Sequence, residues 1–491
     1  MTEDRTAKTE TGVGESGESP LEELGAIVGR QFVVTGDALE PFTHDATFLE
    51  GQASAAVLPG STDEVSRVIA VCNRLGIAVV ARGSGTSLVG GPVSLTGGIV
   101  LSLERMNDIV IDRGNVCAIA GAGAITGKIQ EAAALYGLMY PPDPASLQMS
   151  SIGGNVACNS GGPSCLKYGV TADYVMGMTV ALADGQVLNL GGRTRKRSSG
   201  YRLAHLFVGS EGTLGVVTEV VLKLIPLTKY RATGMIGFRA GRDAAAAVAR
   251  LMGSGYLPAA LELMDRGALE VVRHLLPPGF ESDFDCVLLI EQDGSSADQV
   301  QDELERMVVV LDGDDNRLAQ SNSEREKLWH ARRSFAQVLM ALPKNFFAED
   351  VSVPIAAIPE MLERVHQLAA ETGLKIPVVG HAGDGNLHPC FVFENGQRGS
   401  VGPAAARLFA DAVELGGSIS GEHGLGALKR DHAAREHSDL EFGLMKRIKE
   451  IFDPRGVLNP HKVFPEAPAD DAFLDRQPGW RDGRRRSEIG D

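Results

Sequence analysis

The sequence predicts a mixed helix-and-strand protein of two or three domains, and three observations support this. The chain has 491 residues, more than one hydrophobic core ordinarily accommodates. Hydrophobic residues make up 44% of it, enough for more than one packed core. Short strands and glycine loops dominate the first half, whereas longer alternating strands and helices follow from about Thr228. This change of pattern predicts a domain boundary there.

Composition excludes several classes of protein. The formal net charge of -16 argues against general nucleic-acid binding. No run of eighteen apolar residues occurs and the N-terminus is polar, so we expect neither a membrane span nor a secretory signal. The six cysteines are scattered without a C-x-x-C pair, which indicates neither a disulfide framework nor a thiolate zinc site. We therefore expect a cytoplasmic protein, with a peripheral position at the membrane left open.

The first half is expected to begin with a disordered tail over residues 1–20, where Thr, Glu, Gly and Ser recur without periodicity. A short helix near Pro20–Arg30 follows, and from residue 53 the pattern runs strand, helix, strand. Helix starts are predicted at Ser61 and Thr126. Strands are predicted at Ala55–Leu58, Ile77–Val80, Val116–Ala120 and Val220–Ile225.

Two glycine loops follow strands directly. The first begins Arg82-Gly83-Ser84-Gly85-Thr86-Ser87 and continues to Gly91. Its closely spaced backbone N–H groups, hydroxyls and arginine suit a diphosphate, and an ordinary turn is the alternative. The second, Gly121–Gly127, resembles the phosphate turn of a dinucleotide-binding βαβ unit. No regular succession of such units surrounds it, so we favour the first loop.

Small residues are densest at Pro141–Gly162, and a second run lies at Gly209–Thr218. So many small residues predict a ligand that lies against bare main chain. Between the two runs, residues 193–197 form a basic cluster, which is either a solvated loop or a partner contact.

Longer strands and helices alternate in the second half. Strands are predicted at Gly234–Phe238, Ala260–Met264, Cys286–Glu291, Phe346–Val353 and Ile376–Gly380. Helices are predicted at Arg242–Met252, Ala297–Leu311, Ile358–Glu371, Pro403–Leu415 and Leu440–Phe452, and a further long helix holds Trp329, Arg332 and Arg333. Residues 466–491 are expected to form a second disordered tail.

Histidines and a glutamate in the second half have the pattern of a metal site. His381 and His388 flank a glycine-rich bend, and Glu422 and His423 follow in another glycine-rich loop. Imidazole and carboxylate are ligands that a borderline divalent ion prefers. A turn cap is the ordinary role of any single histidine, but four candidate ligands among glycines favour a metal. Three ligands with an open position would indicate a catalytic ion.

Taken together, these motifs resemble the FAD-linked D-2-hydroxyacid dehydrogenases, the group of D-lactate dehydrogenase, the FAD subunit of glycolate oxidase and D-2-hydroxyglutarate dehydrogenase. The resemblance runs from about Phe48 to Lys462. It rests on Arg82–Gly91, Pro141–Gly162, Lys167–Gly169, Gly209–Thr218, Gly380–Pro389, Gly421–Gly426 and Asn459–Lys462.

This resemblance implies an α+β fold of the vanillyl-alcohol-oxidase (PCMH) type. Residues 48–227 would form a two-subdomain FAD-binding domain. Residues 228–465 would form an α+β cap domain with an antiparallel sheet, which carries the metal site and a C-terminal segment that contacts FAD. The implied FAD-binding residues are Arg82, Gly83, Ser84, Gly85, Thr86, Ser87, Pro142, Ser151, Gly153, Gly154, Asn159, Gly161, Gly162, Glu211, Gly212, Gly215, Val217 and Asn459. Thr86 stands where some relatives bind flavin through a histidine, so we expect non-covalent FAD.

The resemblance also implies roles in the metal cluster. His381, His388 and Glu422 would bind zinc, ferrous iron or manganese, and His423 would be the general base. Arg332 would hold the substrate carboxylate, with Arg333 as the alternative. The implied reaction is the oxidation of a small D-2-hydroxyacid to the 2-oxoacid, with hydride transfer to flavin N5.

The substrate and the electron acceptor are less well defined. Where D-2-hydroxyglutarate enzymes place Thr, Lys and Asn around the substrate, this chain has Ala336, Ala348 and Cys390. A second buried carboxylate would lack partners there, which favours D-lactate or glycolate. A D-2-hydroxyglutarate dehydrogenase and a flavin-bearing electron-transfer subunit of a glycolate oxidase complex are the alternatives. The acceptor stays open between quinone, cytochrome, flavoprotein and oxygen, as does the presence of partner subunits.

Overall fold

The structure is a computed structural model that describes residues 19–47, 49–278, 280, 284–342 and 345–466. The tails predicted at 1–20 and 466–491 lie outside the described residues except at their inner ends. There, Ser19 caps helix α1 (Pro20–Val28) in a capping box with Glu22. At the other end, the Glu466 carboxylate lies 2.8 Å from the guanidinium of Arg430. Ser19 and Glu466 therefore belong to the folded chain, contrary to the prediction, whereas Pro20 begins the helix predicted near Pro20–Arg30.

The first half contains a four-stranded sheet in the order β1 (Val33–Val34), β2 (Ala55–Val57), β4 (Ile99–Ser102) and β3 (Val79–Arg82). Helix α2 (Thr62–Leu75) packs on it with the predicted apolar face of Val65, Val68, Ile69 and Cys72. The Ser61 side chain accepts a hydrogen bond from the backbone N–H of Glu64, which confirms the predicted helix start.

A second, antiparallel sheet of five described strands lies beside the first. Its order is β5 (Ile109–Asp112), β6 (Cys117–Gly121), β10 (Val216–Lys223), β8 (Val175–Ala181) and β9 (Val187–Gly191). Helices α3 (Thr126–Ala134), α4 (Ile152–Cys158) and α7 (Ala204–Phe207) bury apolar side chains against it. The remaining short elements of this half are α5 (Cys165–Tyr168), α6 (Thr171–Tyr174) and the paired strands β7 (Leu138–Met139) and β11 (Ile225–Pro226).

The glycines at 121–127 serve packing in this sheet. Strand β6 pairs antiparallel with both of its neighbours, so the loop after it opens no parallel βαβ unit. A Cβ at Gly121 would lie 2.3 Å from the carbonyl oxygen of Met106, so a larger residue cannot fit there. The predicted helix start at Thr126 is confirmed, but Thr126 does not cap the helix, because its hydroxyl accepts a hydrogen bond of 2.6 Å from the Asn155 amide.

The basic cluster at 193–197 is partly used within the fold. Arg193 lies 2.9 Å from the Asp112 carboxylate, and Arg195 donates to the carbonyl oxygens of Val116 and Leu224. These contacts hold the loop against the edge of the five-stranded sheet. A partner contact at this loop stays a prediction.

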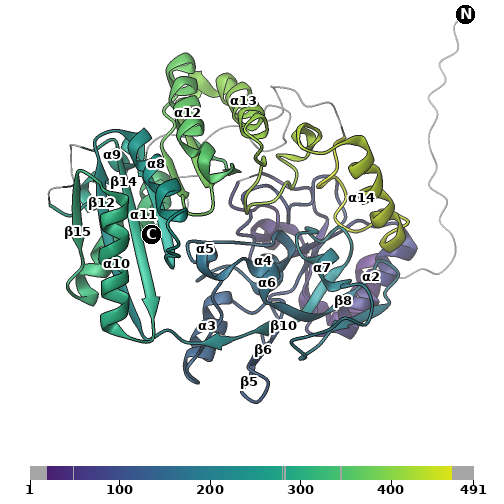
Figure 1. Cartoon of the computed structure of the whole chain (residues 1–491). Helices are drawn as coiled ribbons and strands as arrows, with labels where there is room; N and C mark the ends of the chain where they lie inside the picture. The colour runs from purple at the N-terminus through teal and green to yellow at the C-terminus, as the bar shows by residue number, and fades with distance from the viewer. Residues whose placement is uncertain (1–18, 48, 279, 281–283, 343–344, 467–491) are drawn as a thin grey trace, which may run out of the picture.

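The second half is built on a mixed-length antiparallel sheet of eight described strands (Figure 1). Its order is β15 (Asp315–Leu318), β12 (Tyr230–Phe238), β14 (Cys286–Gly294), β13 (Ala260–Asp265), β18 (Val378–His381), β19 (Asn386–Phe393) and β16 (Asn345–Ala348), with β17 (Val351–Ser352) also paired to β19. The single strand predicted at Phe346–Val353 is therefore wrong. Glu349 and Asp350 separate β16 from β17, and both are fully buried acids.

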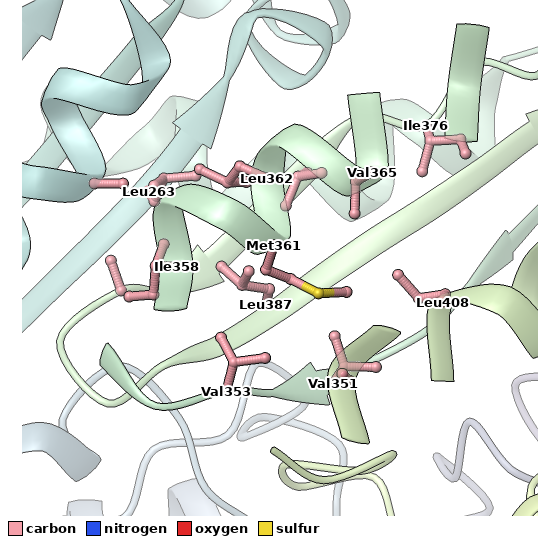
Figure 2. Packing of buried hydrophobic residues seen from close by; sticks show 14 of the residues in the cluster. Leu263, Val351, Val353, Ile358, Met361, Leu362, Val365, Ile376, Leu387 and Leu408 are labelled. Carbon is pink, nitrogen blue, oxygen red and sulfur yellow. The ribbon is translucent and has the colours of Figure 1, made fainter. Parts of the chain in front are cut away.

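Helices cover both faces of this sheet. One face packs against α8 (Gly241–Met252), α10 (Ala297–Leu311), α12 (Ile358–Thr372) and α13 (Val401–Glu414). The other packs against α9 (Arg266–Val271) and α11 (Asn322–Ala341). Figure 2 shows Leu263 of β13 and Leu387 of β19 in the first core, beside Met361 and Leu362 of α12. Because side chains alternate along a strand, the adjacent Glu262 and His388 lie on the α11 face.

The end of the described chain returns to the first half. Helix α14 (Asp439–Phe452) leads to a segment whose Leu458 forms a parallel bridge with Val79 of β3. The rings of Phe452 and Phe207 are in edge contact, with centroids 5.2 Å apart. Figure 1 shows α14, in yellow, beside the purple and blue elements of the first half. The return brings Asn459 next to the first glycine loop.

Asp293 joins the two halves of the chain. This buried residue of β14 accepts hydrogen bonds from Lys167 Nζ (2.6 Å), the Tyr168 hydroxyl (2.8 Å) and the Thr228 hydroxyl (2.8 Å). Burial by itself raises its pKa, but these hydrogen bonds and the charge of Lys167 outweigh burial and hold the pKa below its ordinary value. The Lys167-Tyr168-Gly169 motif thus anchors the sheet of the second half.

Replacement of Asp293 by alanine is expected to lower the free energy of unfolding by about 1–3 kcal/mol, because three half-buried donors lose their shared acceptor. Denaturant unfolding measures the change. The matched control is Asp285→Ala, whose carboxylate pairs with Arg266 at the surface and is expected to matter little. Equal stability of the two variants would contradict the assigned role of Asp293.

Candidate active site

The three predicted metal ligands converge in the structure. His381 ends β18 and His388 lies in the paired strand β19, so both imidazoles stand on the α11 face of the sheet. Glu422 comes from the loop after α13. Nε2 of each histidine lies 3.4 Å from Oε1 of Glu422, and one donor atom from each of the three residues lies within 4.8 Å of the other two. Two nitrogens and one carboxylate oxygen form a set that suits a divalent transition metal.

Asp350 shapes the loop that carries Glu422. Its Oδ2 accepts hydrogen bonds from the backbone N–H groups of Gly421 (2.6 Å) and Glu422 (2.7 Å). Lys429, which is also buried, lies 2.5 Å from Asp350 and 2.8 Å from Glu349. Burial raises the pKa of Asp350, but the adjacent His423 ring and the Lys429 ammonium outweigh burial and hold the pKa far below its ordinary value. An ionised, fully buried carboxylate therefore fixes the loop backbone.

His423 lies beside this cluster. Its ring stacks on that of His388, with centroids 5.4 Å apart and planes inclined by 20°. Nδ1 of His423 lies 3.3 Å from Oδ1 of Asp350. A carboxylate at Nδ1 favours the tautomer that protonates that nitrogen and leaves Nε2 free to accept a proton.

The electrostatics keep two ligands in the forms that bind metals. Burial lowers the pKa of His388 to about 3, so its imidazole is neutral at pH 7. Burial raises the pKa of Glu422, but the hydrogen bond and charge of His381 outweigh it and lower the pKa to about 2. For His381, burial opposes protonation, yet the adjacent carboxylates of Glu262 and Glu422 raise its pKa well above the ordinary value. Neutral imidazole and ionised carboxylate are the donors a metal needs.

The two arginines of α11 differ in their surroundings. Arg332 is 13% exposed, and its Nη2 lies 2.8 Å from Oε2 of Glu262. Arg333 is 52% exposed and pairs with Glu326 on the outer side of the helix. Within the described chain, Nε of Arg332 is buried and has no hydrogen-bond partner, so this donor is free for a ligand. Of the two alternatives, Arg332 is therefore the one beside the cluster.

The first glycine loop and the run at 151–162 lie against each other. A Cβ at Gly83 would lie 1.9 Å from the Ser151 hydroxyl, so only glycine fits at this contact. Three buried polar atoms from separate segments have no hydrogen-bond partner among the described residues: Arg82 Nη1, Ser151 Oγ and Asn459 Oδ1. Free donors and acceptors around a bare backbone are what a dinucleotide requires, so these residues fit FAD.

The same run reaches the metal cluster. A Cβ at Gly161 would lie 2.9 Å from Oε2 of Glu422 and 3.4 Å from Sγ of Cys165. The backbone of a predicted cofactor loop therefore touches a predicted metal ligand. The structure places the two predicted sites side by side, although they are far apart in the sequence.

Some predicted cofactor residues use their side chains elsewhere. Both carboxylate oxygens of Glu211 accept backbone N–H groups, from Leu425 and Gly426, at 2.8 Å. Asn159 ends α4 in the left-handed conformation, and its amide oxygen accepts from the N–H of Ala172. Val217 lies in the core of the five-stranded sheet. The Glu211 carboxylate and the Asn159 amide oxygen therefore hold the fold together.

The remaining predicted cofactor positions lie in these loops or close to them in the sequence. Ser84, Gly85, Thr86 and Ser87 follow Arg82 in the first loop, and Gly153, Gly154 and Gly162 belong to the run at 151–162. Gly212 and Gly215 precede β10, and the carbonyl oxygen of Pro142 accepts from the Gln130 amide at 3.0 Å. The Ser87 hydroxyl accepts hydrogen bonds from the N–H groups of Val89 and Gly91, and the part of these positions in cofactor binding stays a prediction.

The sequence reading missed Glu262 and Asp350. Oε1 of Glu262 lies 2.6 Å from Nδ1 of His381, although 119 residues separate the two in the chain. A signal existed in the sequence, because Glu262 is a charged residue inside the apolar strand Leu261–Met264. A charged residue in such a strand requires a buried partner. Asp350 carried the same kind of signal, since it and Glu349 are charged residues inside the strand predicted at Phe346–Val353.

The fold and these adjoining sites define an FAD-linked oxidoreductase, and comparisons with known proteins give its family. Family models described as "FAD binding domain" and "FAD linked oxidases, C-terminal domain" match residues 53–191 and 227–463. The chain is 39% identical to glycolate oxidase subunit GlcD of Bacillus subtilis (strain 168), over 86% of this chain and 92% of that protein. It is 36% identical to a D-lactate dehydrogenase of Anaerostipes hadrus, over 90% of this chain and 96% of that protein.

A D-2-hydroxyglutarate dehydrogenase of Stutzerimonas stutzeri (strain A1501) is 31% identical, over 90% of this chain and 98% of that protein. The chain belongs to the FAD-linked D-2-hydroxyacid dehydrogenase family. It is an FAD-dependent oxidoreductase that acts on the CH–OH group of 2-hydroxyacids.

Solved structures confirm the fold. p-Cresol methylhydroxylase superposes with a TM-score of 0.74 at 16% identity, covering 91% of this chain and 96% of that one. 4-Ethylphenol oxidase from Gulosibacter chungangensis superposes with a TM-score of 0.73 at 21% identity, covering 91% of this chain and 97% of that one. The predicted α+β fold of the vanillyl-alcohol-oxidase type is therefore confirmed. Among the described residues, no helix has both the length and the apolar character needed to cross a membrane.

Proposed function

We propose that this enzyme oxidises a small D-2-hydroxyacid, with D-lactate or glycolate favoured, to the 2-oxoacid with the help of a divalent metal. One observation carries the proposal: His381, His388, Glu422 and His423 converge where the Gly161 backbone touches Glu422. The proposed base, the proposed metal ligands and a loop predicted to bind FAD would thus all adjoin the place where the substrate binds. A subunit that only passed electrons would not need this arrangement.

Each residue has a role in the proposed reaction. Arg332 holds the substrate carboxylate through the guanidinium N–H groups that Glu262 does not contact, among them Nε. His381, His388 and Glu422 hold the metal, which would lower the pKa of the substrate hydroxyl. His423 accepts the hydroxyl proton at Nε2. FAD, when bound, accepts the hydrogen of the α-carbon together with its two electrons.

Asp350 supports the base in this proposal. Its Oδ1 lies 3.3 Å from Nδ1 of His423, so its negative charge would stabilise the imidazolium that forms when the base takes a proton. Lys429 and Glu349 surround Asp350, so the carboxylate cannot turn toward water.

The substrate is proposed to carry one carboxylate. Ala348 and Cys390 lie directly opposite each other in the β16–β19 ladder, on the face that holds His388. Burial raises the pKa of Cys390 to about 12, so neither position offers a charge at pH 7. A second carboxylate would lie there without a cationic partner.

Two further features belong to the proposal. Thr86 offers no imidazole for a flavin linkage, so FAD is held non-covalently. Similar proteins named glycolate oxidase subunits support a second candidate, in which this chain performs the same oxidation as the flavin-bearing subunit of a complex. The electron acceptor would then be bound by partner chains.

Anaerobic addition of D-lactate or glycolate to the purified FAD-loaded protein is expected to bleach the visible flavin band. D-2-Hydroxyglutarate should bleach it more slowly, and L-lactate should serve as the stereochemical control. Acid precipitation should release the flavin into solution, as expected for non-covalent binding. A flavin band that stays oxidised with every D-2-hydroxyacid would overturn the proposal.

A further inference from the structure

Glu262 contacts two parts of the candidate active site at once. It lies in β13 directly opposite His381 in the antiparallel ladder, so the two side chains share one face of the sheet. Oε1 lies 2.6 Å from Nδ1 of His381, and Oε2 lies 2.8 Å from Nη2 of Arg332. The side chain of Glu262 is 1% exposed. One buried carboxylate therefore joins a metal ligand to the arginine assigned to the substrate carboxylate.

The contact with His381 determines which nitrogen can bind the ion. A carboxylate at Nδ1 keeps the proton on that nitrogen and leaves the lone pair of Nε2 on the side of Glu422. The negative charge also makes the imidazole a stronger donor. Without this carboxylate, the ring could turn and could present either tautomer.

The contact with Arg332 determines where the substrate is held. The guanidinium is largely buried, and a buried cation requires a counter-charge when substrate is absent. Glu262 supplies this charge through one terminal nitrogen only, because Nε of Arg332 stays free among the described residues. Glu262 therefore neutralises and orients the arginine, which keeps free donors for the carboxylate of the substrate.

Resting on the function proposed above, we infer that Glu262 is a positioning residue that sets the spacing between the metal and the substrate carboxylate. It acts through His381 and Arg332 and takes no proton from the substrate. A D-2-hydroxyacid presents its hydroxyl and carboxylate on adjacent carbons, so the two protein groups that receive them must have a defined separation. A single rigid carboxylate between them provides it.

Glu262→Gln tests this inference with little change in shape. The amide can still accept from Nδ1 of His381 through its oxygen, but it carries no negative charge for Arg332 and presents a donor nitrogen on one side. We expect metal affinity, measured by zinc and manganese titration of the FAD-loaded protein, to fall about 10- to 100-fold. We also expect KM for the D-2-hydroxyacid to rise by more than kcat falls.

The matched control is Glu291→Gln. Glu291 is a buried carboxylate of the next strand, β14, and it accepts from Thr233 (2.8 Å) and Trp329 (2.7 Å) outside the cluster. This variant should lose stability but keep metal affinity and KM. Wild-type metal affinity and KM in Glu262→Gln, or equal losses in both variants, would overturn the inference. If the wild-type protein takes up no ion, the metal proposal itself fails, and the KM of Glu262→Gln against Glu291→Gln then decides the role of Glu262.

Discussion

Replacement of His423 by alanine is expected to lower kcat for the D-2-hydroxyacid by about 10²- to 10⁴-fold, the usual contribution of a positioned general base. Alanine removes the Nε2 acceptor without removing any of the three metal ligands. FAD content and metal content should therefore stay near wild type, and KM should change less than kcat. Single-turnover bleaching of the flavin band measures the loss at the chemical step.

The control for this experiment is His366→Ala. His366 also pairs with a buried aspartate, since its Nε2 lies 3.2 Å from Oδ2 of Asp265, but it lies on α12 outside the cluster. That variant should bleach at the wild-type rate. If His423→Ala kept near-normal turnover with flavin and metal both bound, His423 would not be the base.

Replacement of His388 by alanine is expected to remove the metal and with it nearly all turnover. Loss of an outer partner already weakens metal binding 10- to 100-fold, so loss of a ligand should weaken it by at least about 100-fold. Mass-spectrometric metal analysis of the purified variant measures the content directly. FAD should remain, because His388 lies in the sheet of the second half, whereas the glycine loops predicted to bind FAD lie in the first half of the chain.

Cys390→Ala is the matched variant for metal content. Cys390 stands two residues along the same strand on the same face, yet it is not one of the clustered ligands. It should retain wild-type metal content. Stripping wild-type protein with a chelator and restoring it separately with zinc, ferrous iron and manganese then identifies the ion. A His388→Ala protein with full metal content and turnover would show that the cluster is not the metal site.

Local pattern predicted the long helices of this fold but missed several strands, among them β4, β8, β9 and β19. Helix α10 has the predicted bounds, Ala297–Leu311, because apolar residues at helical spacing also form its buried face. Helix α2 begins where Ser61 and Glu64 predicted it. The strand predicted across Glu349 and Asp350 failed, because both acids turn into a buried cluster with Lys429 that no local pattern reveals.

The candidate site divides in the same way. His381, His388, Glu422 and His423 stand out in the sequence, because histidines and a glutamate among glycines form an unusual local pattern. Which atoms face each other depends on pairings across long stretches of chain. Glu262 meets His381 through the β13–β18 register, and Gly161 meets Glu422 where the two halves of the chain touch.

The sequence by itself determined the family, and it predicted the glycine loops for FAD and the set of metal ligands, since each depends on residues that are close together in the chain. Only the tertiary structure decided that Arg332 rather than Arg333 adjoins the cluster, that Asp350 backs His423, and that Glu262 joins Arg332 to His381. These contacts are made by single buried carboxylates whose partners come from distant elements. Sheet register and helix packing determine these partners, and the spacing of residues in the sequence does not predict them.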